Sequence, residues 1–137
     1  MDDRSPVLVV DDDPDIRETL REVIEAEGFA VVCARNGLEA LEALAAGLRP
    51  SLVVLDLMMP AMSGWELLAA IRAERSLADL AVAVISAAGG RAPPPGATCF
   101  LRKPIDLDTL IDLVRDPRGR APRRREHLPG ASGQLNA

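Results

Sequence analysis

The chain has 137 residues, 48% of them hydrophobic, and a formal net charge of −5. A chain of this length buries one core, so we expect one domain and one function. The first apolar run begins at Pro6, too early for a secretory leader, and no stretch approaches the roughly eighteen apolar residues of a membrane span. We therefore expect a cytoplasmic protein without a membrane partner.

Charge divides the chain near residue 116. Residues 1–116 carry 20 acidic and 11 basic side chains, a balance of −9, whereas residues 117–137 carry one acidic and five basic side chains, a balance of +4. The acidic part argues against direct DNA binding. The basic part is rich in Pro, Gly and Arg and poor in apolar residues. We expect a folded domain over 1–116 and a disordered basic tail over 117–137.

Five short apolar runs are typical of parallel strands covered on both faces, because their apolarity is continuous rather than alternating. Cys33 and Cys99 lie inside two of these runs without CxxC spacing, which predicts core thiols and no metal site. In chain order, the predicted strands cover residues 6–11, 30–35, 51–56, 81–86 and 98–103.

Helical patterns fill most of the intervals between these strands. Apolar residues recur at helical spacing in four segments, and capping residues or glycines mark the ends of these segments. The alternation of strand and helix predicts a doubly wound α/β domain with a five-stranded parallel sheet. The helix signals lie at Gly28, Asn36 with Glu39, Gly47, Ser63 with Glu66, and Asp106.

The interval between the fourth and fifth strands departs from this pattern. Residues 87–97 read AAGGRAPPPGA. Proline removes an amide donor and clashes with the preceding helical turn, so no ordinary helix fits the segment. We predict a loop, or at most one turn, and therefore a fourth helix that is missing or reduced.

Four of the five predicted strands end in side chains suited to phosphate and metal chemistry. Asp11 and Asp12 follow the first strand, Asp56 ends the third, Ser86 the fourth and Lys103 the fifth. The carboxyl ends of parallel strands meet at one edge of the sheet, where α/β proteins bind ligands. Lys103 is also the single lysine among 16 basic residues, which suggests that its position needs an ammonium group.

This set of side chains predicts a phospho-acceptor. Clustered carboxylates raise one another's pKa unless a cation lies between them, and an all-oxygen ligand set favours Mg²⁺ or Mn²⁺. A carboxylate oxygen of Asp56 could then attack a phosphoryl group. The cation and the Lys103 ammonium would neutralise the phosphoryl oxygens, and Ser86 would donate a hydrogen bond to one of them.

The same residues give the chain a resemblance to bacterial response-regulator receiver domains of two-component signalling, in their stand-alone, single-domain form. The resemblance covers about residues 6–115. Its motifs are, in order, VVDD at 9–12, DLMMP at 56–60 with Gly64, ISA at 85–87 and KP at 103–104. It implies a flavodoxin-like fold with strand order 2-1-3-4-5.

The resemblance implies a role for each site residue. Asp56 would be the phosphorylated aspartate. Asp12, Asp56 and the backbone carbonyl of Met58 would bind Mg²⁺ directly, whereas Asp11 would act through a metal-bound water.

Three further roles follow from the same resemblance. Ser86 and Phe100 would be switch residues that respond to the phosphoryl group. The Lys103–Pro104 bond would be a cis peptide that aims the ammonium.

The resemblance also implies partners and output. A sensor histidine kinase or a phosphotransfer protein would donate the phosphoryl group, and an unknown downstream protein would be contacted directly. The chain would not be an enzyme beyond self-phosphorylation and autodephosphorylation. Two alternatives stay open: a pseudo-receiver that works without phosphorylation, and an enzyme or flavin protein of the same architecture. The absence of Tyr speaks against a flavin carrier, and Met58 stands where a phosphoaspartyl hydrolase would have a second acid.

Overall fold

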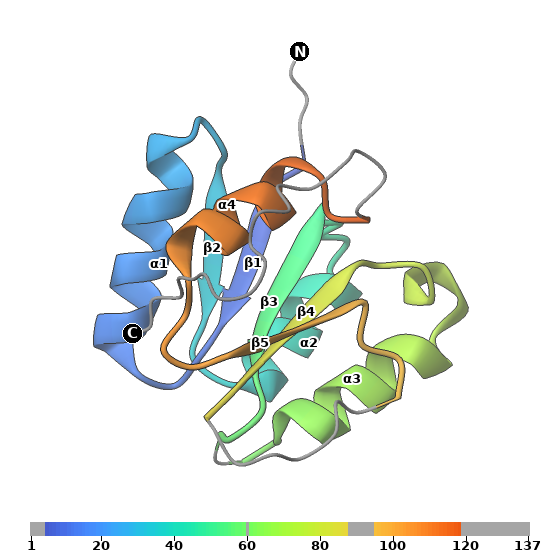
Figure 1. The fold of residues 1–137 in the computed structure, drawn as a ribbon. Helices are drawn as coiled ribbons and strands as arrows, with labels where there is room; N and C mark the ends of the chain where they lie inside the picture. Colours follow the sequence, from blue (N-terminus) through green and yellow to red (C-terminus); the bar gives the residue numbers. More distant parts are fainter. Residues whose placement is uncertain (1–4, 60, 88–94, 119–137) are drawn as a thin grey trace.

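The computed structural model describes residues 5–59, 61–87 and 95–118. They form one parallel five-stranded sheet with helices on both faces (Figure 1). The sheet order is β2-β1-β3-β4-β5, so the predicted order 2-1-3-4-5 is confirmed. The strands are β1 (Val7–Val10), β2 (Val31–Ala34), β3 (Leu52–Asp56), β4 (Val82–Ser86) and β5 (Cys99–Arg102).

Two hydrophobic clusters lie on opposite faces of the sheet. The helices α1 (Pro14–Ala26) and α4 (Leu107–Arg115) cover one cluster, and α2 (Gly37–Ala45) and α3 (Gly64–Ala73) cover the other. A short 3-10 turn, η1 (Arg75–Leu77), links α3 to β4. In the described part of the chain, no helix has the length and apolar character that a membrane crossing requires.

The helices begin and end where the sequence places their signals. Ser63 and Glu66 form a reciprocal capping box at the start of α3. At the start of α2, Asn36 accepts a hydrogen bond from the Glu39 amide, but the Glu39 carboxylate binds Arg35 instead of completing a box. Beyond the C-terminal ends of α1 and α2, Gly28 and Gly47 have φ of 94° and 112°, which glycine adopts without strain.

The prediction of two core thiols was wrong for Cys33. Its side chain is exposed, whereas Cys99 is half-buried. Both cysteines lie on edge strands, β2 and β5, whose residues are less buried than those of the central strand β1. An apolar run in the sequence does not tell a central strand from an edge strand.

The interval between β4 and β5 is described only at its two ends. Ala87 and residues 95–98 contain no helix, and residues 88–94, on which most of the loop prediction falls, lie outside the described residues. Residues 119–137 of the predicted tail lie outside them as well. The described residues form four α-helices, and none of these lies between β4 and β5. This agrees with the predicted missing or reduced fourth helix.

Candidate functional site

Three carboxylates meet at the carboxyl edge of the sheet. One carboxylate oxygen from each of Asp11, Asp12 and Asp56 lies within 4.8 Å of the others. The register of β1 and β3 pairs Val10 with Leu55, so the residues that follow, Asp11 and Asp56, emerge side by side. Asp11 is 1% and Asp56 4% exposed, whereas Asp12 is exposed.

Asp11 is held tightly but keeps one free oxygen. Its Oδ1 accepts a hydrogen bond from the Asp13 amide at 2.9 Å. Its Oδ2 is buried and has no hydrogen-bond partner within the described residues. Burial raises the pKa of the Asp11 carboxyl to about 6, with the Asp56 and Asp12 charges adding to the rise and the Asp13 amide opposing it. A buried, half-satisfied carboxylate is costly unless something binds it.

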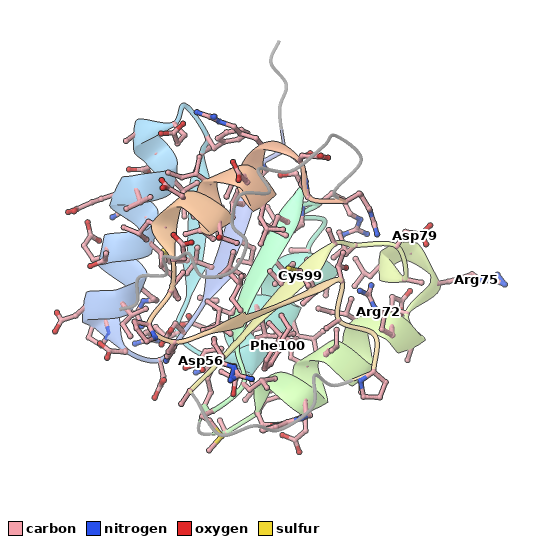
Figure 2. The ribbon with its side chains drawn as sticks, in the orientation of Figure 1. Asp56, Arg72, Arg75, Asp79, Cys99 and Phe100 are labelled. Carbon is pink, nitrogen blue, oxygen red and sulfur yellow. The ribbon has the colours of Figure 1, made fainter. Side chains whose placement is uncertain are left out.

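Asp56 faces the one lysine of the chain. Lys103 Nζ lies 3.7 Å from Asp56 Oδ2, and the Met58 amide donates to Asp56 Oδ1 at 3.3 Å. Burial raises the pKa of the Asp56 carboxyl, and the Lys103 ammonium partly offsets that rise. Figure 2 shows Asp56 near the lower end of the sheet.

Gly64 lets α3 begin directly against the end of β3. A Cβ at this position would lie 2.6 Å from the carbonyl oxygen of Asp56 and 2.6 Å from Leu57 Cα. The Gly64 amide donates to the Leu57 carbonyl at 2.9 Å, and the Leu57 amide donates to Ile85 at 3.1 Å. The backbone at Asp56 is therefore fixed from α3 and from β4.

Lys103 is positioned by backbone pairing at the end of β5. Its amide donates to the Ser86 carbonyl at 2.9 Å, and the Lys103–Pro104 bond is cis, as the resemblance implied. Ser86 itself is half-buried, and its hydroxyl donates to the Ala87 carbonyl at 3.1 Å. The structure thus brings Lys103 onto Asp56 but turns the Ser86 hydroxyl toward its own backbone.

Phe100 and Met58, which were also assigned to the site from the sequence, contribute to it in different ways. Phe100 is half-buried on β5 and packs against the cluster beneath α2 and α3. The Met58 side chain is 64% exposed, so its contact with the site is through the backbone.

Sequence reasoning missed Arg17. Its Nη1 donates to the carbonyl oxygen of Asp11 at 2.8 Å. The available signal was an arginine in the first turns of the helix that follows Asp11, since helical side chains lean toward the N-terminus.

The donor set fits a hard divalent cation. Three carboxylates face one ammonium, which leaves an uncompensated negative charge, and the buried Oδ2 of Asp11 is an acceptor without a hydrogen-bond partner among the described residues. Oxygen ligands without His or Cys suit Mg²⁺ or Mn²⁺. The arrangement can hold such an ion and present the buried carboxylate of Asp56 beside two cations, the metal ion and the Lys103 ammonium.

Comparison with known proteins agrees with this geometry. The family model of the response regulator receiver domain matches residues 7–115. The chain is 38% identical over 114 residues to the response regulator MprA of Mycobacterium sp. (strain KMS), a match that covers 80% of this chain and 48% of that protein. The chain therefore spans about half the length of the curated relatives it matches.

Solved structures give the same result. A response regulator receiver protein from Pseudomonas putida is 32% identical, with a TM-score of 0.73 and coverage of 84% of this chain and 98% of that one. A putative response regulator from Chloroflexus aurantiacus is 26% identical, with a TM-score of 0.77 and coverage of 85% and 99%. The fold, the acidic cluster and the family match lead to one conclusion: the chain belongs to the response regulator receiver domain family of two-component systems.

Proposed function

We propose that this receiver domain is a Mg²⁺-dependent phospho-acceptor and that Asp56 is the residue phosphorylated. The observation that carries the proposal is the acidic cluster, in which the buried Asp56 lies 3.7 Å from Lys103 and beside Asp11 and Asp12. A purely packed domain gains nothing from burying two acidic side chains next to a third.

The ligand roles follow from the donor set. Asp12, Asp56 and the Met58 carbonyl would bind Mg²⁺ directly. Asp11 would act through a metal-bound water, which would donate a hydrogen bond to its buried Oδ2, an atom without a partner among the described residues. When bound, the ion would neutralise negative charge on the oxygens of the incoming phosphoryl group.

The transfer is a displacement at phosphorus. An oxygen of Asp56 forms a bond to the phosphorus of the donor, the bond from phosphorus to the leaving group breaks, and the leaving group departs with the electron pair. Lys103 moves its ammonium from the Asp56 carboxylate to a phosphoryl oxygen. The Ser86 hydroxyl stops donating to the Ala87 carbonyl and donates to the phosphoryl group instead. Phe100 then moves as the second switch residue.

The proposed donor is a sensor histidine kinase or a phosphotransfer protein, and the proposed output is contact with a downstream protein. The only reactions that we propose for the domain itself are its self-phosphorylation and its autodephosphorylation. Its curated relatives are named as response regulators, which supports a role of this domain in signalling.

Incubation with acetyl phosphate tests the proposal. In the presence of Mg²⁺, we expect the intact mass to rise by one phosphoryl group, and with a chelator we expect no rise. Asp56→Asn removes the nucleophile while keeping its shape, so it should give no adduct. Asp79→Asn, a change at an exposed aspartate near η1, is the matched control and should behave as the wild type.

Two results would contradict the proposal. One is a wild-type protein that forms no Mg²⁺-dependent adduct, which is what the pseudo-receiver alternative requires. The other is an undiminished adduct in Asp56→Asn.

A further inference from the structure

The turn between β1 and α1 carries two of the three carboxylates, and one side chain outside the cluster holds it. Arg17 donates from Nη1 to the carbonyl oxygen of Asp11 at 2.8 Å. The backbone amide of Arg17 donates to the carbonyl of Asp13 at 3.0 Å. The second bond is the first backbone bond of α1, so only the bond from Nη1 to the Asp11 carbonyl depends on an arginine at this position.

Helix geometry explains how the Arg17 side chain reaches the Asp11 carbonyl. Arg17 is the fourth residue of α1, which begins at Pro14. The side chain of a helical residue leans toward the N-terminus of its helix, so the half-buried arginine folds back over the turn that precedes α1. The guanidinium is a rigid, permanently charged donor, and its hydrogen bond to a carbonyl is stronger than one between neutral groups.

The Arg17 contact completes the fixing of Asp11. The Asp11 amide donates to the Ala34 carbonyl at 3.2 Å, its carbonyl accepts from Arg17, and its Oδ1 accepts from the Asp13 amide. Only Oδ2 lacks a hydrogen-bond partner among the residues that the structure describes. The orientation of that oxygen is set by the three bonds that hold the rest of the residue.

We propose that Arg17 is a positioning residue for the divalent cation: it clamps the β1–α1 turn so that Oδ2 of Asp11 and the carboxylate of Asp12 face the ion. This inference rests on the proposed function, since it concerns the same site. The Arg17 guanidinium contacts a backbone carbonyl, whereas the Lys103 ammonium lies against the Asp56 carboxylate. We therefore expect the loss of Arg17 to act mainly on the geometry of the turn.

Mg²⁺ affinity, measured by isothermal titration calorimetry, tests the clamp. Arg17→Ala should weaken Mg²⁺ binding by about tenfold, the loss expected when a hydrogen bond from a charged donor is removed. Arg17→Lys keeps one donor and should recover part of the affinity. Arg21→Ala is the matched control, because Arg21 lies one turn along α1 and pairs only with Glu18 and Glu25 among the described residues. It should bind Mg²⁺ as the wild type does.

Hydrogen exchange separates the clamp from the metal site. Without Mg²⁺, the Asp13 amide should exchange faster in Arg17→Ala than in Arg21→Ala, while the thermal midpoints of the two variants stay similar. Arg17→Ala with wild-type Mg²⁺ affinity would overturn the inference. A wild type that binds no cation would refute the proposed function instead. In that case unchanged exchange at Asp13 would overturn the clamp, and faster exchange would support it.

Discussion

Arg72 joins the segment before β5 to the end of α3 and the start of β4, and its removal tests how that region is held. Its guanidinium donates to the Gly96 carbonyl from Nε at 2.9 Å and from Nη2 at 2.6 Å. From Nη1 it donates to Ala78 at 2.9 Å and to Leu80 at 2.8 Å. Figure 2 shows Arg72 turned toward the β5 side and Arg75 pointing away from the molecule.

The expected loss can be worked out from these contacts. Arg72→Ala removes four hydrogen bonds to three carbonyls, each worth about 0.5 to 1.5 kcal/mol net. Three of the four bonds are exposed, so water replaces part of what is lost. We therefore expect the free energy of unfolding to fall by about 2 kcal/mol, and Tm by about 8 °C for a domain of this size.

Urea and thermal unfolding measure this loss. Arg75→Ala is the matched control, because Arg75 is an exposed arginine only three residues along the chain, and it should unfold within about 0.5 kcal/mol of the wild type. Arg72→Lys should fall between the two, since an ammonium cannot reach all three carbonyls. If Arg72→Ala is no less stable than Arg75→Ala, the carbonyl contacts contribute nothing and the reasoning is refuted.

Three further outcomes are expected. Gly64→Ala places a Cβ 2.6 Å from backbone atoms of Asp56 and Leu57, so thermal unfolding should show a loss of about 1 to 3 kcal/mol together with slower adduct formation; wild-type values for both would contradict the contact. Lys103→Ala should bind Mg²⁺ more tightly in calorimetry, because a competing positive charge is removed, yet form the Asp56 adduct at least tenfold more slowly; weaker Mg²⁺ binding would contradict this. Because burial raises the pKa of Asp11 to about 6 from 3.8, the folded chain binds that proton more tightly than the unfolded chain. Without Mg²⁺, stability should therefore fall by up to about 3 kcal/mol as pH rises from about 4 to about 6, and Mg²⁺ affinity should rise over the same range. Thermal unfolding and calorimetry across that range, with Asp11→Asn as the control, check both trends, and a flat profile in the wild type would contradict them.

The centre of the site could be predicted because it depends on where strands end. Asp11, Asp56 and Lys103 each follow an apolar run, and parallel strands bring such positions together whatever the details of packing. The register of the two strands then places the two buried aspartates side by side, because Val10 pairs with Leu55. Local sequence is enough for this part because strand direction and strand ends are encoded locally.

The contacts of Arg17, Arg72 and Cys33 could not be predicted in the same way. The bond from Arg72 to Gly96 joins residues 24 positions apart and depends on how α3 and β5 meet. The bond from Arg17 to Asp11 depends on the side-chain rotamer over the β1–α1 turn. The exposure of Cys33 depends on β2 being an edge strand, which follows from the strand order and not from the run itself. These features belong to tertiary packing, which periodicity does not describe.

The electrostatics of the cluster argue for a ligand rather than for a structural role. Lys103 lies beside Asp56, whereas Oδ2 of the buried Asp11 has no hydrogen-bond partner among the described residues. Burial, together with the neighbouring negative charges, raises the pKa of Asp11. A domain that served only as a contact surface would be more stable with an apolar or amide side chain at this position. The same burial that lowers stability without a bound cation strengthens the attraction of the carboxylates for a divalent cation, because little water screens them. An unfavourable arrangement of this kind is expected where a site binds charge from outside the chain.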